Sequence, residues 1–415
     1  MAKKPNIRFA GFEDDWEQRK LGEIATETYG GGTPKTSNEE FWKGDIPWIQ
    51  SSDLIDECLF DVRPRKCISQ EAVSKSATKL VPQNSIAIVT RVGVGKLAFM
   101  PFSYATSQDF LSLSGLKIDP KFTVYALYKM MQSVSNEVQG TSIKGVTKDE
   151  LLAKKIIFPS CNEQKKIGAY LHNLDHLITL HQRKCDELKK VKKFMLQKMF
   201  PKKGEKNPEI RFDGFTNDWE QRKLGATNTF FTDGNYGEAY PKLSDMTDSG
   251  SGVPFLTGGN LKDGKLSLDG ASYITPEKHS KLTSGHLLED DIVIAVRGSL
   301  GALGYVNTDN SGWNINSQLA ILRTDKSELY GKFLIQYLLS WTGQNELLKR
   351  QTGSALKQLP IGAIKDVEVP ITSIAEQEKI GEYFADLDNL ITLHQRKCEE
   401  LKNVKKYMLQ NMFAK

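Results

Sequence analysis

The sequence has no long apolar run and few cysteines. Its longest uninterrupted apolar stretches, such as Ile86–Val89 and Ile292–Val296, fall far short of the roughly 18 residues that a membrane-spanning helix needs. Its 5 cysteines include no Cys-x-x-Cys pair, and their odd number is typical of free thiols in a reducing compartment. No apolar segment resembling a signal peptide follows the first residues. We therefore expect a cytoplasmic protein that does not associate with a membrane.

The motifs of common enzyme active sites are also missing. There is no His-Glu-x-x-His, no Gly-x-Ser-x-Gly, no zinc-type cysteine and histidine spacing, and no Asn-Pro-Pro-Tyr of the kind used by amino-methyltransferases. Gly93–Lys96 resembles part of a phosphate-binding loop, but Thr90 and Leu97 break that pattern. His172 and His176 have the spacing of a metal pair, yet a later copy of the same segment lacks both, which favours a solvated helix face. We predict no catalytic residue, no metal site and no cofactor bound by this chain.

The composition is that of a folded protein with a small net charge. Hydrophobic residues make up 39% of the 415 residues and charged residues 26%, which indicates globular domains rather than disorder. The length is sufficient for more than one domain. The net charge of +5 is compatible with a nucleic-acid partner but is not diagnostic of one.

Two blocks of the sequence occur twice. Pro5–Gly22 returns as Pro208–Gly225 with 14 of 18 positions identical, and Ser160–Phe200 returns as Ser373–Phe413 with 29 of 41 identical. The segments between these blocks share almost no direct identity. We interpret the two blocks as two copies of one docking surface that carry two different readers, and we favour this over passive drift after duplication.

The repeat also sets the predicted domain boundaries. They are residues 1–159 for a first recognition domain, 160–200 for a first helix, 201–207 for a polar linker, 208–372 for a second recognition domain and 373–415 for a second helix.

The two helical segments have apolar residues at heptad spacing, with one histidine in the middle of each stripe. Ser160 and Ser373, each followed three residues later by glutamate, predict capping boxes. Antiparallel pairing centred on the histidines brings together Leu174 with Leu401, His181 with His394, and Leu188 with Leu387. At about 1.5 Å per residue the rod would be about 60 Å long and would hold two readers at its opposite ends. Lysines near the helix ends, among them Lys192 and Lys405, fit a solvated face better than contact with DNA phosphates.

The divergent segments predict the same order of elements in both halves. Strands are expected at 46–50, 85–89, 96–100 and 110–116 with a helix at 122–138, and again at 291–296, 302–306 and 319–322 with a helix at 329–348. Arg91 matches Arg297, and Ser107-Gln108 matches Ser317-Gln318. The predicted fold class is α/β (α+β): two small mixed recognition domains separated by an antiparallel two-helix coiled-coil spacer, with internal pseudo-twofold duplication.

Polar loop residues of the divergent segments are candidates for DNA contact. Glycine-rich loops let the backbone approach a phosphate, arginine at a strand end can pair with guanine, and glutamine can pair with adenine. For each residue a structural or surface role has equal weight. The candidates are Lys35, Thr36, Ser37, Arg91, Lys96, Gln108 and Lys144 in the first half, and Asn235, Tyr236, Arg297, Gln318 and Lys357 in the second.

Several motifs together carry a family resemblance. They are Trp-Glu-Gln-Arg-Lys-Leu-Gly at Trp16–Gly22 and again in the second half, the run from Gly31 to Ile49 with Gly-Gly-Thr-Pro and Gly-Asp-Ile-Pro-Trp-Ile, the Glu-Gln-x-x-Ile starts of both helices, and the closing Leu-x-x-x-Lys-Lys-x-Met-Leu-Gln. With these motifs the whole chain resembles the specificity (S) subunit of type I restriction-modification enzymes. The second half departs from the pattern, with Asp233–Gly237 in place of Gly-Gly-Thr-Pro.

The resemblance implies two target recognition domains, each reading one half of a split, asymmetric sequence in double-stranded DNA. The helices would dock two methyltransferase (M) subunits that use S-adenosylmethionine to methylate adenine after flipping it out of the duplex. Restriction (R) subunits would add translocation and cleavage that consume ATP and need Mg. This chain would itself catalyse nothing. Two alternatives stay open: a scaffold that holds two proteins apart without DNA, and a bipartite transcriptional regulator that binds DNA alone.

Overall fold

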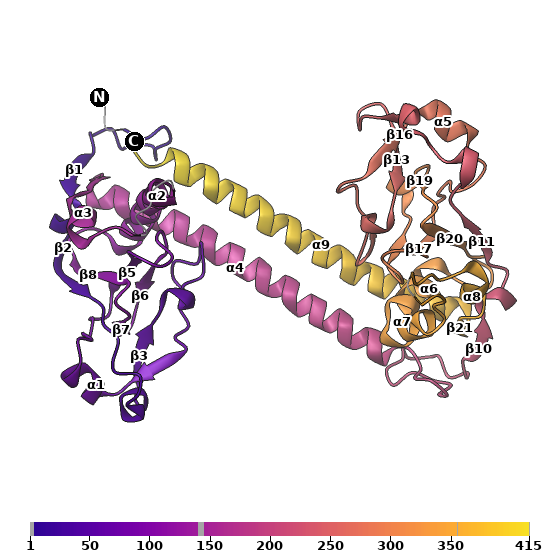
Figure 1. Ribbon diagram of the computed structural model, residues 1–415, viewed down its shortest axis with the longest axis horizontal. Coiled ribbons are helices and arrows are strands. Elements are labelled where there is room, and N and C mark those ends of the chain that lie inside the picture. The colour runs from indigo at the N-terminus through magenta and orange to yellow at the C-terminus, as the bar shows by residue number, and fades with distance from the viewer. Residues whose placement is uncertain (1–3, 140–144, 355, 415) are drawn as a thin grey trace. The chain divides into compact units, whose positions relative to one another are not determined.

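The computed structural model describes residues 4–139, 145–354 and 356–414 (Figure 1). The chain divides into two compact units, which we refer to as the first and the second unit. They comprise Met1–His181 with Arg396–Lys415, and Gln182–Gln395. Each unit contains one divergent segment together with a part of each long helix.

The first unit is built on an antiparallel sheet of four strands in the order β2-β8-β5-β6 (Figure 1). Their bounds are Ala25–Gly30, Phe110–Leu116, Ser85–Val89 and Leu97–Met100. Every residue of β5 is buried because both faces of the sheet are covered. Ile86 and Ile88 pack in the cluster that contains residues of α2 (Pro120–Gln139), whereas Ala87 and Val89 pack in the cluster that contains Ile49. The strands and the helix predicted for this segment are confirmed.

A smaller sheet of the first unit has the order β4-β3-β7, with bounds Lys66–Ile68, Ile46–Ile49 and Ala105–Thr106. Strand β3 pairs antiparallel with β4 and parallel with β7. The short helix α1 (Gln70–Lys75) follows β4, and the hydroxyl of Ser69 caps it by accepting a hydrogen bond from the backbone N–H of Ala72 at 3.2 Å.

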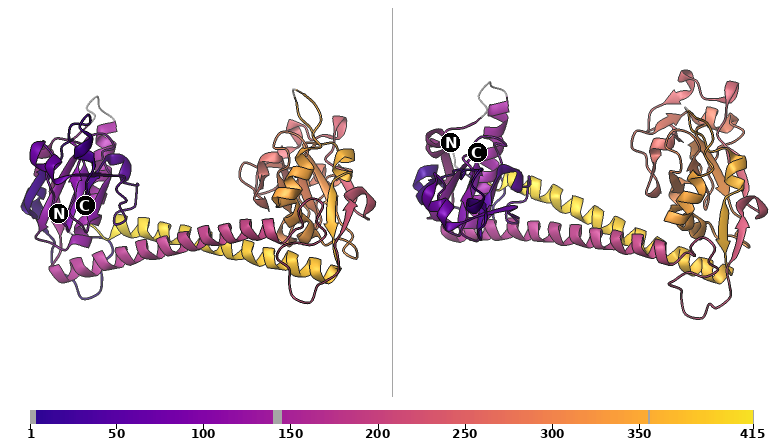
Figure 2. Two further views of the ribbon diagram at one scale, coloured as in Figure 1. Left: turned by 90° about the horizontal axis from the view of Figure 1, so that it is seen from below. Right: turned by 60° about the horizontal axis from the view of Figure 1, so that its bottom comes forward.

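The second unit repeats this plan with additional strands (Figure 2). Its main sheet has the order β11-β20-β17-β18-β15-β14, with bounds Phe230–Asp233, Leu319–Arg323, Ile292–Ala295, Leu303–Tyr305, Gly264–Leu266 and Leu261–Lys262. Its smaller sheet has the order β12-β16-β13-β19, with bounds Met246–Thr247, Ser272–Ile274, Val253–Leu256 and Asn314–Ile315. Helix α5 (Pro276–Lys281) takes the place of α1.

The single helix predicted at 329–348 is wrong. The chain forms α6 (Gly331–Leu339) and α7 (Trp341–Leu348), which are separated at Ser340. The Ser340 hydroxyl accepts a hydrogen bond from the backbone N–H of Gly343 at 3.1 Å, which caps the start of α7. A serine inside an apolar periodic run therefore ends one helix and begins the next.

The two copies of the N-terminal block form the same structure in both units. Strand β1 (Glu17–Lys20) pairs antiparallel with β9 (Lys155–Phe158), and β10 (Glu220–Lys223) pairs antiparallel with β21 (Glu368–Ile371). The short helices α3 (Lys148–Ala153) and α8 (Ile361–Lys365) precede β9 and β21. The repeated block is thereby joined to the segment that leads into each long helix.

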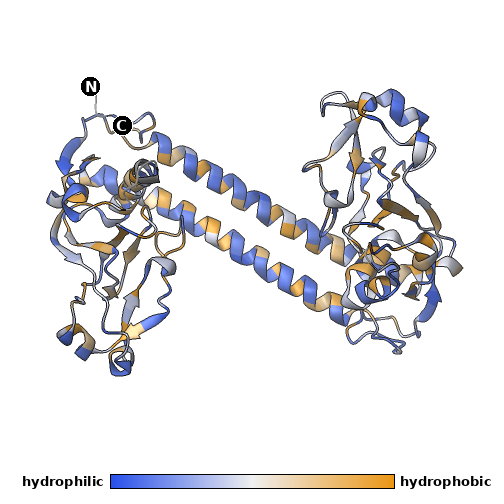
Figure 3. Ribbon diagram, in the orientation of Figure 1, coloured by the Kyte–Doolittle hydropathy of each residue, from blue (hydrophilic) through white to orange (hydrophobic). Residues whose placement is uncertain are grey.

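The long helices are α4 (Cys161–Lys198) and α9 (Ile374–Asn411), and apolar residues follow a stripe along each (Figure 3). Within the first unit their segments run antiparallel. Leu174 and Leu401 belong to one apolar cluster, and the Sγ atom of Cys398 lies 3.9 Å from the carbonyl oxygen of Ile178.

In the second unit Leu188 and Leu387 belong to one apolar cluster as well. His181 lies in the first unit and His394 in the second, so the pairing of these two histidines stays a prediction.

The predicted capping boxes are wrong, because both glutamates bind arginines from the N-terminal blocks. Glu163 is fully buried and accepts hydrogen bonds at 2.7 and 2.8 Å from Nε and Nη2 of Arg8. Glu376 is equally buried and accepts hydrogen bonds at 2.6 and 2.8 Å from the same atoms of Arg211. The glutamate of each Glu-Gln motif thus joins the N-terminal block to the helix.

The glutamine of each motif joins the recognition domain to the helix. Gln164 accepts a hydrogen bond from the backbone N–H of Asp119, at the start of α2, at 2.8 Å. Gln377 accepts the equivalent bond from Tyr330, at the start of α6, at 2.9 Å. Both glutamines are buried, so the motif serves to assemble each unit.

Candidate nucleic-acid interface

Three loops of the first unit converge at one end of the main sheet. Strand pairing places Gly30 opposite Leu111 and Val89 opposite Phe110. Because the strands are antiparallel, the ends of β2 and β5 therefore meet the starts of β8 and β6. We refer to the loops at this end, residues 31–37, 90–96 and 107–109, as the first loop edge. Residues 234–237, 296–302 and 316–318 form the corresponding second loop edge.

A glycine brings the backbone very close to a neighbouring loop at each edge. A Cβ atom on Gly31 would lie 1.8 Å from the carbonyl oxygen of Ser107, and one on Gly234 would lie 2.3 Å from that of Asn316. The backbone N–H of Gly31 also donates to Phe110 at 3.3 Å, as that of Gly234 does to Leu319 at 3.4 Å. No residue with a side chain fits either position without a shift of the backbone. Gly31 and Gly234 thus occupy equivalent positions in the two runs.

Most of the first-half candidates lie exposed at the first loop edge. They are Lys35, Thr36, Ser37, Arg91 and Gln108. Lys96 is instead half-buried, because its ammonium group donates to the carbonyl oxygen of Leu54 at 3.0 Å and lies 3.8 Å from Asp56. Lys144 lies outside the described residues.

At the second loop edge Arg297 lies over the ring of Tyr236, with its Cζ atom 5.4 Å from the ring centroid. The Tyr236 hydroxyl donates to the carbonyl oxygen of Ser317 at 3.0 Å. Burial, together with a hydrogen bond to Asp233, raises the pKa of Tyr236, so the hydroxyl stays protonated. Arg297 is exposed, as are Gln318 and Lys357. The guanidinium group is thus oriented by the ring while its outer edge faces solvent.

The structure contradicts the assignment of Asn235 to DNA contact. Its side chain is buried; the amide donates to the carbonyl oxygen of Ser284 at 2.7 Å and accepts from the hydroxyl of Thr283 at 3.1 Å. Gly32 has the equivalent position in the first unit, where its backbone packs directly against Ala77. Asn235 therefore stabilises the second loop edge by binding the segment that contains Thr283 and Ser284.

The match between Ser107-Gln108 and Ser317-Gln318 is shifted by one residue. The backbone N–H of Thr90 donates to Asp109 at 2.7 Å, and that of Val296 donates to Gln318 at 2.9 Å. Gln318 therefore corresponds to Asp109 rather than to Gln108. Arg91 and Arg297 do occupy equivalent positions, since each directly follows the residue that makes this bond.

The lysines Lys192 and Lys405 do not belong to a solvated face, nor are they available to phosphates. Each pairs with an aspartate of the other long helix, at 2.7 Å for Lys192 with Asp388 and 2.5 Å for Lys405 with Asp175. Tyr125 of α2 also donates to Asp175. These lysines therefore bind the helices to one another inside each unit.

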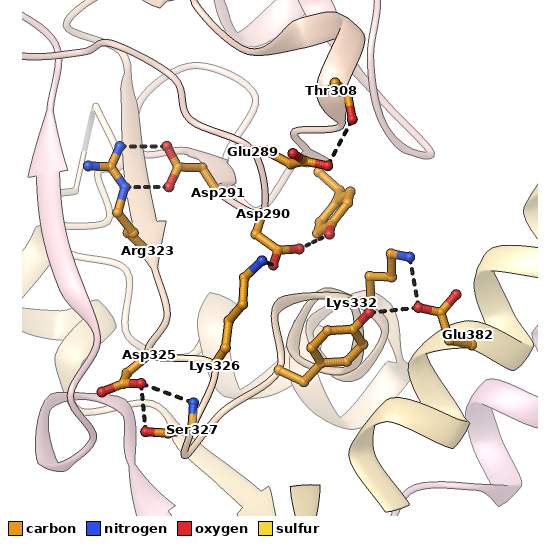
Figure 4. A network of polar contacts seen from close by, with 12 residues as sticks. Glu289, Asp290, Asp291, Thr308, Arg323, Asp325, Lys326, Ser327, Lys332 and Glu382 are labelled. Carbon is orange, nitrogen blue, oxygen red and sulfur yellow. Dashed lines mark hydrogen bonds and ion pairs between the residues drawn. The ribbon is translucent and has the colours of Figure 1, made fainter. Parts of the chain in front are cut away.

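The opposite end of the second unit's sheet is held by ion pairs (Figure 4). Arg323, at the end of β20, donates from Nε and Nη2 to both oxygens of Asp291 at 2.7 Å. Nearby, Lys332 and Tyr330 donate to Glu382 of α9 at 2.8 and 2.6 Å, and these bonds lower the pKa of that carboxyl. This end is thus attached to the long helix, whereas Arg297 at the loop edge is exposed.

In the part of the chain that the structure describes, no group of three histidine, cysteine, aspartate or glutamate side chains could hold a metal ion. Nor does any helix within residues 4–139, 145–354 and 356–414 combine the length and apolarity needed to cross a bilayer.

Comparison with known proteins agrees with the duplicated architecture. The sequence profile of the type I restriction modification DNA specificity domain matches residues 13–190 and again residues 217–403. The chain belongs to this family. It is 24% identical over 414 residues to the type I restriction enzyme MjaIX specificity subunit of Methanocaldococcus jannaschii, covering 96% of this chain and 92% of that one. It is 34% identical over 176 residues to the EcoR124I/EcoR124II specificity subunit of Escherichia coli, covering 40% and 42%.

A solved structure shows the same fold as this specificity subunit. The crystal structure of a type I restriction-modification S subunit from M. genitalium superposes with a TM-score of 0.65 at 16% identity, covering 99% of each chain. The predicted fold class, mixed helix and sheet in two repeated domains with long helices, is confirmed.

Sequence reasoning missed Trp42, Arg65 and Lys66, which line an open hollow of 430 Å³ beside Thr36. Sequence reasoning also missed that β3, which reads Ile-Pro-Trp-Ile, and β13, which reads Val-Pro-Phe-Leu, are equivalent strands of the two units. Both strands pair antiparallel with their neighbours in the same register.

Proposed function

We propose that this specificity subunit reads a bipartite, asymmetric site in double-stranded DNA, one half-site at each loop edge. One observation carries the proposal: the two edges share their strand pairing and the close glycine contact but differ in their exposed side chains. Arg91 and Arg297 occupy equivalent positions, while Gln108 corresponds to Ser317. Two readers with one scaffold and different contact groups suit two different half-sites.

The long helices dock two copies of one partner, a methyltransferase subunit. Exposed apolar side chains recur at matching positions of both helices, beside the stripe that pairs them. They are Leu177, Leu180, Val191 and Phe194 on α4, and Leu390, Leu393, Val404 and Tyr407 on α9. Apolar groups exposed on a water-soluble helix are typical of an interaction surface, and their duplication suits two identical partners.

The chemistry belongs to the partners. Methyltransferase subunits flip an adenine out of the duplex and methylate it with S-adenosylmethionine. Restriction subunits add cleavage of unmodified DNA that depends on ATP and Mg. The chain itself selects the site and catalyses no step.

The test exchanges residues 226–372 for the equivalent segment of a related specificity subunit and maps methylated adenines in cellular DNA. Only one half of the methylated sequence should change. The matched exchange of residues 23–159 should change only the other half. A change of both halves by one exchange would contradict independent reading.

A second experiment separates this function from its alternatives. In gel-shift assays the chain should retard the mobility of cognate DNA only together with its methyltransferase partner. Tight binding by the chain alone would indicate a transcriptional regulator, and no binding in either case would indicate a scaffold. Within the complex, Arg297→Ala should cost about 1–3 kcal/mol of base discrimination at one half-site.

A further inference from the structure

We propose that the first unit also binds a DNA backbone phosphate, in the hollow lined by Trp42, Arg65 and Lys66, and that the second unit has no such site. The inference rests on the proposed DNA-reading function and adds a contact that is independent of base sequence. It would make the two half-sites unequal in their dependence on salt.

The hollow has a volume of 430 Å³ and combines cations with an aromatic wall. Thr36, Trp42, Arg65, Lys66 and Cys67 line it. The Nζ atom of Lys66 lies 5.4 Å from the ring centroid of Trp42 and 5.8 Å from that of the buried Trp48. The two rings hold the ammonium group through cation–π contacts, which leave its N–H bonds able to reach an anion.

The aromatic wall is rigid. The rings of Trp42 and Trp48 meet edge to face, with centroids 4.9 Å apart and an interplanar angle of 90°. The indole N–H of Trp48 donates to the carbonyl oxygen of Gly32 at 3.0 Å, and that of Trp42 donates to Lys35 at 3.4 Å. Both partners lie on the first loop edge, so the hollow is attached to the loops that read DNA.

Lys66 and Arg65 have N–H groups that can donate to a ligand. Among the described residues, no carboxylate lies within ion-pair distance of Lys66. Arg65 has its Nε atom 3.4 Å from Asp53 and donates from Nη2 to the carbonyl oxygen of Ser52 at 3.2 Å, which orients the guanidinium group. Its remaining N–H groups are available, and the side chain is 71% exposed. A guanidinium and an ammonium group side by side suit a phosphate.

A short series of neighbouring residues links the loop that contains Arg91 to Arg65. A Cβ atom built on Gly93, in the loop that follows Arg91, would lie 3.8 Å from the side chain of Ser51. Ser51 begins the short helix η3 (Ser51–Asp53), and Arg65 binds the next residue of this helix. We therefore expect a DNA strand whose bases meet Arg91 to place a backbone phosphate at the hollow.

The second unit lacks the cations at the equivalent positions. Lys66 pairs across the sheet with Trp48, and the corresponding pair in the second unit is Ser272 with Phe255. Ala271 then stands in the place of Arg65. The aromatic residue is kept in the second unit while both positive charges are absent.

The test measures the salt dependence of DNA binding by the complex of the full chain with its methyltransferase subunits. The probe is a duplex that carries the methylated sequence determined by adenine mapping, and fluorescence anisotropy gives the affinity between 50 and 200 mM salt, roughly the range over which such contacts are resolved. The double variant Arg65→Gln with Lys66→Gln should reduce the slope of log K against log salt by about 0.9, the value for one phosphate contact on B-DNA. The methylated sequence should stay the same, because a backbone contact carries no sequence information.

Lys75→Gln is the matched control. Lys75 is an exposed lysine of the same unit that pairs with Glu71 at 2.7 Å and does not line the hollow. It should leave the slope unchanged. An unchanged slope in the double variant would overturn the phosphate site, and a changed first half of the methylated sequence would show base reading instead. Failure of the unaltered complex to bind any duplex would overturn the proposed function itself.

Discussion

Replacing Arg8 by methionine should destabilise the first unit strongly, because it leaves the carboxylate of Glu163 buried without a partner. Glu163 is fully buried and receives two charge-assisted hydrogen bonds from Arg8. Breaking a buried ion pair by removing one partner costs about 3–5 kcal/mol. We expect a decrease of about 3–5 kcal/mol in the free energy of unfolding of the first unit.

A second substitution tests the reasoning. Adding Glu163→Gln to the variant should recover most of the stability at pH 7, because no charge is then buried.

The assay has to report each unit separately, since a chain with two units does not unfold in one step. Hydrogen exchange in increasing urea, read on peptides of β1 and β9 for the first unit and of β10 and β21 for the second, meets this need. Arg211→Met is the matched variant and should destabilise the second unit instead. A loss below about 1 kcal/mol, or no recovery of stability when Glu163→Gln is added to Arg8→Met, would refute the argument.

Three further predictions concern buried groups. Lys405→Met leaves Asp175 with only the hydrogen bond from Tyr125 and should cost the first unit about 2–3 kcal/mol in urea unfolding. Burial lowers the pKa of His172. Its neutral ring therefore stabilises the fold above pH 6.5, and this contribution is lost as the pH falls through the folded-state pKa. The variant His172→Phe should thus lose less stability than the unaltered chain between pH 7 and pH 5. Asn235→Ala should raise hydrogen exchange in residues 282–286 without changing the chain's salt slope for DNA.

The sequence by itself determined the elements whose signals are local. Periodic apolar residues predicted β5 and β8, and the heptad stripe predicted α4 and α9, because these patterns follow from the geometry of a strand and a helix. The repeated blocks predicted two units of one design. Motifs in duplicate also identified the family before any tertiary contact was known.

The tertiary structure alone decided which polar residues are used inside the protein. Glu163 has the spacing of a capping box, but it binds Arg8, which lies 155 residues away in the sequence. Asn235 and Lys405 read as surface residues, and both are buried because partners from distant segments satisfy them. Hydrogen bonding of a buried polar group depends on what folding brings beside it, which no local pattern records.

The same limit applies to the loop edges. Gln108 and Gln318 match in sequence, yet the backbone bonds of neighbouring strands show that Asp109 and Gln318 occupy equivalent positions in their two units. The Lys66 hollow arises because two strand pairs bring Trp48 beside a lysine in one unit and Phe255 beside a serine in the other. Register between strands is set by long-range pairing, and a slip of one residue exchanges every side chain between faces. Local periodicity therefore determined the elements, and only their pairing decided which side chains are exposed at the loop edges.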